Sequence, residues 1–224
     1  MKKRDLFAVL GLLGAGSLLF ASCIQRNYYN ANPNNNYNHN HYTDSSYVYD
    51  EEFNGVDNYV WNFTDAADSA YAGVIDSGYQ YVDYSSVKSN MTFVGTAVNI
   101  ADNFSVITRI KSNNMMGLIF GASSTSNGYA FYVDTAGYYS LYEEGTGTTA
   151  SIPVIPSTQD TLYALKKNWN VLEVDQANGV WTGYINGTQV FSMAARPLGG
   201  GSFGFKILPG TEGYAGYLKV NGYY

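Results

Sequence analysis

The chain has 224 residues, a formal net charge of −6 and only 13% charged residues. The acidic balance argues against nucleic acid as a partner, because binding nucleic acid needs basic side chains that neutralise phosphates. With 22 tyrosines and 24 glycines, the composition favours many short strands joined by tight turns.

The first 22 residues are typical of an export signal. Residues 2–4 are basic, and the apolar run Leu6–Ala21 is shorter than the roughly 20 residues of a membrane-spanning helix. Small residues then lead to Cys23, the only cysteine of the chain. This arrangement resembles a bacterial lipobox, which implies cleavage before Cys23 and acylation of that residue with fatty acids such as palmitate. An ordinary secretory signal with an incidental cysteine is the alternative.

Acyl chains on Cys23 are expected to hold the mature protein on a membrane, since each buried CH₂ contributes about 0.8 kcal/mol. Removal of residues 1–22 takes away three basic residues and one acid, which changes the net charge from −6 to −8. Electrostatic attraction to anionic lipid is therefore not expected. We predict a lipoprotein of the cell outer membrane that faces the periplasm or the cell surface.

Residues 23–49 are interpreted as a disordered linker behind the lipid. The segment Asn27–Asn40 contains eight asparagines and has no apolar period. His39 and His41 lack a third ligand nearby, so we expect no metal site in the linker. Residues 50–224 contain no further cysteine and are expected to form one domain, whose stability comes from its core rather than from disulfides.

From Glu52 onward, short apolar or alternating runs recur at the spacing of a β-sandwich. Two prolines in Ile152–Pro156 predict an edge strand or a loop. The clearest pattern, Asn168–Phe191, predicts three strands joined by turns, of which the second is an Asn-Gly turn. Trp181 shares the parity of Ile185 and is therefore expected inside.

A longer pattern carries a resemblance to a known superfamily. Trp-Asn-x-Leu-x-Val at residues 169–174, followed after a turn by Tyr-Ile-Asn-Gly-x-x-Val at residues 184–190, resembles the middle of concanavalin A-like lectin/glucanase domains, including their laminin G-like and 3-keto-disaccharide hydrolase-like branches. The resemblance implies an all-β, antiparallel two-sheet jelly-roll sandwich. It does not imply one function, because lectins, hydrolases and spacer modules share this fold.

Period-two alternation also predicts which side chains point outward from the strands. Those with binding chemistry are Arg109, Tyr132, Tyr142, Glu173 and Tyr184. If their strands adjoin on one sheet, they offer rings, a cation and a carboxylate to a carbohydrate. The alternative is a solvated sheet face with tyrosines at ordinary strand positions.

No catalytic residue is predicted. Laminarinase-type enzymes of this fold carry Glu-x-Asp-x-x-Glu, and here Glu173-Val174-Asp175 is followed by Asn178 at the last position. An amide cannot serve as a general acid or base, so the two-carboxylate mechanism lacks its second group. No cofactor is expected, although the resemblance allows a structural calcium ion, for which Asp50, Glu51 and Glu52, or Asp65 and Asp68, are candidate ligands.

We therefore interpret the sequence as an envelope lipoprotein with a non-catalytic β-sandwich that binds carbohydrate. A glycoside hydrolase or a 3-keto-disaccharide hydrolase-like enzyme is one alternative. A structural or interaction lipoprotein without a sugar ligand is the other.

Overall fold

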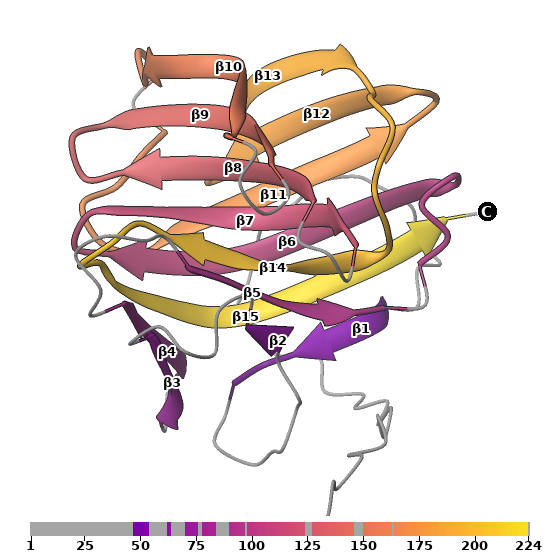
Figure 1. Ribbon diagram of the computed structural model, residues 1–224. Helices are drawn as coiled ribbons and strands as arrows, with labels where there is room; N and C mark the ends of the chain where they lie inside the picture. The colour runs from indigo at the N-terminus through magenta and orange to yellow at the C-terminus, as the bar shows by residue number, and fades with distance from the viewer. Residues whose placement is uncertain are drawn as a thin grey trace, which may run out of the picture.

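The protein is a sandwich of two antiparallel sheets (Figure 1). The computed structural model describes residues 47–53, 62–63, 70–75, 78–83, 90–96, 98–123, 127–145, 150–162 and 164–223. These residues form strands and connecting loops, and no helix occurs among them. The targeting segment, Cys23 and most of the predicted linker lie outside the described residues.

One layer is an eight-stranded sheet with the order β13-β12-β11-β6-β15-β4-β3, in which β1 also pairs with β15. Its strands are β13 (Thr188–Ala194), β12 (Val180–Ile185), β11 (Asn170–Ala177), β6 (Asn103–Ser112), β15 (Glu212–Tyr223), β4 (Gly78–Asp83), β3 (Ala70–Ile75) and β1 (Tyr47–Glu51).

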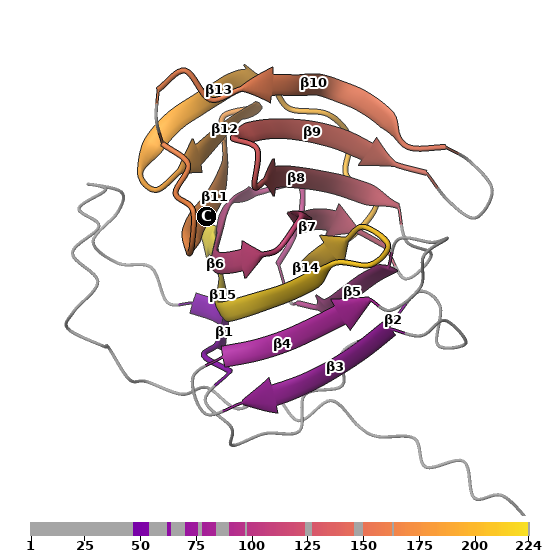
Figure 2. The same ribbon diagram turned by 90° about the vertical axis from the view of Figure 1, so that its left-hand side faces the viewer.

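The other layer is a seven-stranded sheet with the order β10-β9-β8-β7-β14-β5-β2. Its strands are β10 (Ile152–Gln159), β9 (Tyr138–Glu144), β8 (Gly128–Asp134), β7 (Met115–Ala122), β14 (Ser202–Ile207), β5 (Asn90–Gly95) and β2 (Asn62–Phe63). Figures 1 and 2 show β10 and β13, the end strands of the two layers, at the same end of the sandwich.

The chain passes between the layers several times. It leaves the eight-stranded sheet after β6, builds β7 to β10 in the other sheet, and returns for β11 to β13. It then crosses once more for β14 and ends in β15, which lies between β6 and the pair β4 and β1. This architecture confirms the predicted two-sheet jelly-roll sandwich.

The three strands predicted in Asn168–Phe191 are β11, β12 and β13. Asn178 and Gly179 join the first two strands with φ values of 52° and 73°, and Asn186 and Gly187 join the last two with 49° and 82°. Positive φ at both central residues matches the right-handed twist of a hairpin and is tolerated best by Asn and Gly. The Asn-Gly pairs thus set the register that points Leu172 and Val174 inward.

The core between the sheets is rich in aromatic rings. Trp181 is completely buried, and its indole lies edge-on to two rings of the opposite sheet, with centroid distances of 4.6 Å to Tyr129 and 5.2 Å to Phe120. Phe131 and Phe191 make a similar contact across the layers at 5.2 Å. Such pairs add about 0.5–1.5 kcal/mol each to the area that they bury. The predicted burial of Trp181 is confirmed.

Two strands near the sheet edges show where the sequence prediction was right and where it was wrong. Strand β10 is the last strand of its sheet, as its prolines predicted, because a proline has no N–H to give to a second neighbour. Among the described residues, however, the first strand is β1, Tyr47–Glu51, which precedes the predicted start at Glu52. Tyr47–Tyr49 lies next to an asparagine-rich segment, but its β-forming residues pair with β15.

We expect Gly183→Ala to destabilise the protein by about 1–3 kcal/mol, because a Cβ on Gly183 would lie 2.0 Å from the ring of Phe191 and the packed core has no room for it. Chemical denaturation would measure the change. Gly222→Ala is the matched control, since no heavy atom lies within 4 Å of its Cβ. Equal stability of the two variants would contradict the packing described here.

Candidate functional site

The structure divides the five predicted binding residues between two faces of the molecule. Arg109 in β6, Glu173 in β11 and Tyr184 in β12 share the outer face of the eight-stranded sheet, since the alternate positions of these strands are buried in the core. Tyr132 in β8 and Tyr142 in β9 point outward from the other sheet. The five do not share one face, because the chain changes layers after β6.

Tyr132 points away from the main core, as predicted, but it is only 4% exposed. Its ring covers Gly117 and lies edge-on to Tyr142 at 5.9 Å. With Ile119, Ala122 and Ala130 it forms a second, smaller apolar cluster. The Tyr132 hydroxyl donates to Glu144 Oε1 at 2.9 Å, and burial raises the pKa of this hydroxyl well above its ordinary value. Tyr132 therefore packs and bonds within the protein and does not present a ring to solvent.

The outer face of the eight-stranded sheet carries an acidic group of side chains. Glu173 lies opposite Tyr184 on β12, and Ser105 Oγ donates to Glu173 Oε1 at 3.4 Å. Burial, and then the nearby Asp175 carboxylate, raise the pKa of Glu173 to about 7. Burial and the same two carboxylates also raise the pKa of Tyr184. This acidic cluster (Ser105, Glu173, Asp175 and Tyr184) can accept and donate hydrogen bonds at neutral pH.

Next to it on the same face lies a group of rings and cations. The guanidinium carbon of Arg109 is 4.5 Å from the centre of the Trp169 ring. Lys111 Nζ is 4.9 Å from the same ring and 4.4 Å from the ring of Tyr214. Cation–π contacts of this kind contribute about 0.5–1 kcal/mol each at exposed sites and restrict the side chains involved. We call Arg109, Lys111, Trp169 and Tyr214 the Trp169 cluster.

Gly216 makes room for this cluster. A Cβ at position 216 would lie 2.7 Å from Arg109 Nε and 2.9 Å from one of its terminal nitrogens. The guanidinium of Arg109 therefore lies against the backbone of β15 on one side and has Trp169 as its ring partner. Arg109 Nε is buried and has no hydrogen-bond acceptor among the described residues.

Two asparagines hold the loop that carries Trp169. Asn170 accepts a hydrogen bond from the Lys166 N–H at 2.8 Å and donates to the Lys166 carbonyl at 2.9 Å. Asn186, in the turn between β12 and β13, donates to the Ala164 carbonyl at 2.7 Å and to Asn170 Oδ1 at 2.8 Å. The hairpin turn thus anchors the loop before β11, and the hydrogen bonds of these two asparagines hold the backbone on either side of Trp169.

Three members of the Trp169 cluster were not among the predicted site residues. Trp169 lies four residues before Glu173 and directly before β11. Extending the alternation of that strand by one residue therefore places Trp169 outward, like Glu173. Lys111 has the parity of Arg109 in β6, so the same alternation places it outward. Tyr214 could not be placed by parity, because the register of β15 against β6 shifts between Ala215 and Tyr217 and reverses the alternation.

The described residues contain no group of three or more His, Cys, Asp or Glu side chains that could hold a metal ion. Of the calcium candidates, Asp50 and Glu52 both bind Lys219, with 3.2 Å between Lys219 Nζ and Asp50 Oδ1. Asp65 and Asp68 lie outside the described residues. The structural calcium ion that the resemblance allows is therefore not tested by these residues.

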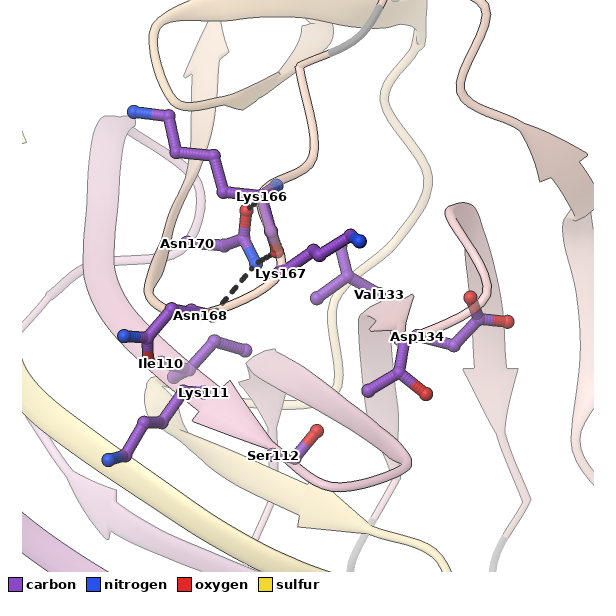
Figure 3. Close-up of a pocket in the computed structure, with 10 residues that line it drawn as sticks. Ile110, Lys111, Ser112, Val133, Asp134, Lys166, Lys167, Asn168 and Asn170 are labelled. Carbon is purple, nitrogen blue, oxygen red and sulfur yellow. Dashed lines mark hydrogen bonds between the residues drawn. The ribbon is translucent and has the colours of Figure 1, made fainter.

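A hollow lies at one end of the sandwich, between the end of β6, the end of β8 and the loop before β11 (Figure 3). Lys111, Lys166, Lys167 and Asp134 are among its lining residues. Its volume is about 20 Å³, which is room for a water molecule rather than for a sugar ring. This hollow is therefore too small to take a sugar residue.

The geometry around Glu173 offers no second carboxylate for the two-carboxylate mechanism where the laminarinase pattern has one. Asn178 lies in the turn after β11, where its N–H donates to Asn103 Oδ1 at 3.0 Å. Asp175 is on the same strand and is linked to Glu173 by a hydrogen bond that helps to raise the pKa of Glu173. Two carboxyls joined by a hydrogen bond lie too close together to flank a glycosidic bond, because glycosidases need about 5–5.5 Å or more between them.

No protein-family profile matches the sequence, and no characterised protein matches it significantly. Solved structures do match. A carbohydrate-binding module, CBM66, from Bacillus subtilis has a TM-score of 0.56 at 13% identity, over 72% of this chain and 94% of that one. A Bacillus subtilis protein of unknown function with a galectin-like fold has a TM-score of 0.54 at 12% identity, over 80% and 98%.

The carbohydrate recognition domain of Emp47p has a TM-score of 0.53 at 8% identity, over 80% of this chain and 96% of that one. The chain therefore has the fold of concanavalin A-like domains, as the sequence resemblance predicted. Identities this low establish a shared fold and no more.

We expect the folded protein to lose stability as the pH rises from about 4.5 to 7. Below that window the Glu173 carboxyl is protonated in both the folded and the unfolded chain, whereas above it the half-buried group must ionise. Glu173→Gln should remove this loss, which is on the order of 3 kcal/mol. Chemical denaturation across the pH range would measure it.

Glu143 supplies the control, because its side chain is 45% exposed and its Oε2 lies 3.4 Å from Arg196 Nη1. Glu143→Gln should leave the pH profile unchanged. If the free energy of unfolding of Glu173→Gln changed with pH in parallel with that of the unmodified protein, the raised pKa of Glu173 would be contradicted.

Proposed function

We propose that this protein is a non-catalytic carbohydrate-binding module, which binds its ligand on the outer face of the eight-stranded sheet. The observation that carries the proposal is the placement, on that one face, of the Trp169 cluster beside the acidic cluster. Three of the residues predicted from sequence, Arg109, Glu173 and Tyr184, belong to these two clusters.

The aromatic ring, carboxylates and cations of the two clusters match the groups that a sugar presents. An aromatic ring such as Trp169 packs against the apolar C–H face of a pyranose. Carboxylates accept hydrogen bonds from sugar hydroxyls, and Arg and Lys donate to ring and hydroxyl oxygens. Some proteins that share the fold are named for carbohydrate binding or recognition, which supports the same class of ligand for this chain.

The place of action proposed here rests on the sequence alone. The basic residues, apolar run and Cys23 at the N-terminus support a lipoprotein anchored in the outer membrane by acyl chains on Cys23. Residues 23–46 would then act as a tether that lets the sandwich reach a polysaccharide at the periplasmic or outer surface. No helix of the described residues is long and apolar enough to cross a membrane.

A hydrolase is the second candidate, favoured by one observation. Burial, and then the Asp175 carboxylate, raise the pKa of Glu173 to about 7, and carboxyls with strongly shifted pKa values are frequent in catalytic sites. Release of reducing sugar from a glycan, abolished by Glu173→Gln, would replace the binding proposal with this one. Absence of turnover together with retained binding would favour the binding module.

Trp169→Ala should weaken binding of the recognised polysaccharide at least about tenfold, because it removes the ring against which a sugar would stack. A panel of immobilised polysaccharides and affinity electrophoresis would measure retention. Tyr142→Ala, on the opposite sheet, is the control and should leave binding unchanged. Loss of binding in Tyr142→Ala with full binding in Trp169→Ala would move the site to the other face.

If no polysaccharide is retained and an envelope protein is recovered instead through the sandwich domain, the interaction lipoprotein is the better description. That result would remove the carbohydrate proposal.

Cys23→Ser should release the protein from the membrane, since acyl transfer needs the thiol. Labelling of cells with a fatty-acid analogue, followed by fractionation, would show label on the unmodified protein in the membrane fraction and none on the variant. Unlabelled protein that is soluble in both cases would indicate an ordinary secretory signal.

A further inference from the structure

The cations of this acidic protein are distributed unevenly. The described residues include seven Lys and Arg side chains. Three have a carboxylate partner: Arg196 with Glu143, Lys206 with Glu144, and Lys219 with Asp50 and Glu52. The other four have no carboxylate within 4.0 Å among the described residues, and they are Arg109, Lys111, Lys166 and Lys167.

These four cations gather at one corner of the sandwich. Arg109 and Lys111 belong to the Trp169 cluster, and Lys111 lines the hollow together with Lys166 and Lys167. Figure 3 shows the three lysine side chains extending from the end of β6 and from the loop before β11. Like charges brought together without counter-charges repel one another, and a bound anion removes that repulsion.

Acidic groups also lie near this corner, but among the described residues none of them pairs with its four cations. Glu212 accepts a hydrogen bond from the Tyr214 hydroxyl. Asp134 lines the hollow, but its Oδ1 accepts hydrogen bonds from the N–H groups of Ala136 and Tyr138, each at 2.9 Å. Glu173 is a diagonal neighbour of Arg109 across β6 and β11, and its pKa of about 7 leaves it only partly ionised at neutral pH. Four cations thus gather without a paired carboxylate among the described residues, in a chain whose net charge is −6.

We propose that this corner binds the anionic groups of an acidic polysaccharide, with Arg109 and Lys111 contacting a carboxylate or sulfate and Trp169 supporting the sugar that bears it. The inference rests on the proposed function and names its ligand class. The guanidinium of Arg109, fixed between Gly216 and Trp169, presents a planar set of donors that matches a carboxylate in a bidentate contact. Lys166 and Lys167, which are exposed, extend the positive surface along the polymer.

The test compares one polymer backbone with and without charge. Binding of polygalacturonate to the purified protein is measured against that of its methyl-esterified form, with alginate and dextran sulfate as further acidic probes and dextran as a neutral one. We expect polygalacturonate or another acidic polymer to bind at least about tenfold more tightly than the neutral polymers, and the binding to weaken as sodium chloride rises from about 0.05 to about 0.2 M.

Variants separate a built site from general attraction. Arg109→Gln/Lys111→Gln should weaken acidic binding at least about tenfold, whereas Arg196→Gln, which removes a cation outside the corner, should change it less than about twofold. Lys111→Gln/Lys166→Gln serves as the second variant if loss of Arg109 disturbs folding. If Arg196→Gln weakened acidic binding as much as Arg109→Gln/Lys111→Gln does, the binding would be unspecific charge attraction, and the proposal would be overturned.

Gly216→Ala gives a test without any change of charge. Its methyl group would displace the Arg109 guanidinium, so acidic binding should fall about threefold or more while the salt dependence stays nearly the same. Equal binding of esterified and unesterified polymer, or binding of neutral polymers only, would overturn the acidic ligand and leave carbohydrate binding intact. No binding to any polymer would overturn both.

Discussion

The rest of the structure depends on the burial of one indole and the hydrogen bonds that make its burial possible. Trp181 is fully buried, and its Nε1–H donates to Gln176 Oε1 at 2.8 Å. The amide nitrogen of Gln176 in turn donates to the carbonyls of Ile100 and Asp102 at 3.0 and 2.9 Å. A buried indole N–H without an acceptor would cost about 1–3 kcal/mol, so this chain of bonds fixes β11, β12 and the segment before β6 against the rings of the other sheet.

That constraint also determines what faces solvent. Because side chains alternate along a strand, fixing Trp181, Gln176 and Leu172 inward fixes Glu173 and Asp175 outward, and the pairing with β6 adds Arg109 to the same face. The candidate site is therefore a consequence of core packing and needs no loop of its own. Trp169 is the exception, since the hydrogen bonds of Asn170 and Asn186 position the loop that carries it.

The fold was predictable because its signals are local. Alternation identified Leu172, Val174 and Trp181 as inward, and the Asn-Gly pairs gave hairpin turns whose positive φ values the structure contains. The site was predictable only in part, because a shared face depends on which strands become neighbours. Tyr132 shows the limit, since parity gave its direction correctly but not its sheet, nor the hydrogen bond to Glu144 that accompanies its burial. The register shift in β15, which turns Tyr214 toward Lys111, leaves no recognisable pattern in the sequence.

Glu144 and the Trp169 cluster, which lie on opposite outer faces, use charge in different ways. On the seven-stranded sheet, Glu144 accepts hydrogen bonds from Tyr132 and Ser151 and pairs with Lys206, so its buried carboxylate is satisfied within the protein. Such pairs keep buried charges tolerable and leave little field outside the protein. At the Trp169 cluster, cations meet rings instead of carboxylates, which holds Arg109 and Lys111 in place without neutralising them. A ring restricts a cation without cancelling its formal charge, and this is the physical difference between a charge used for stability and a charge kept for a ligand.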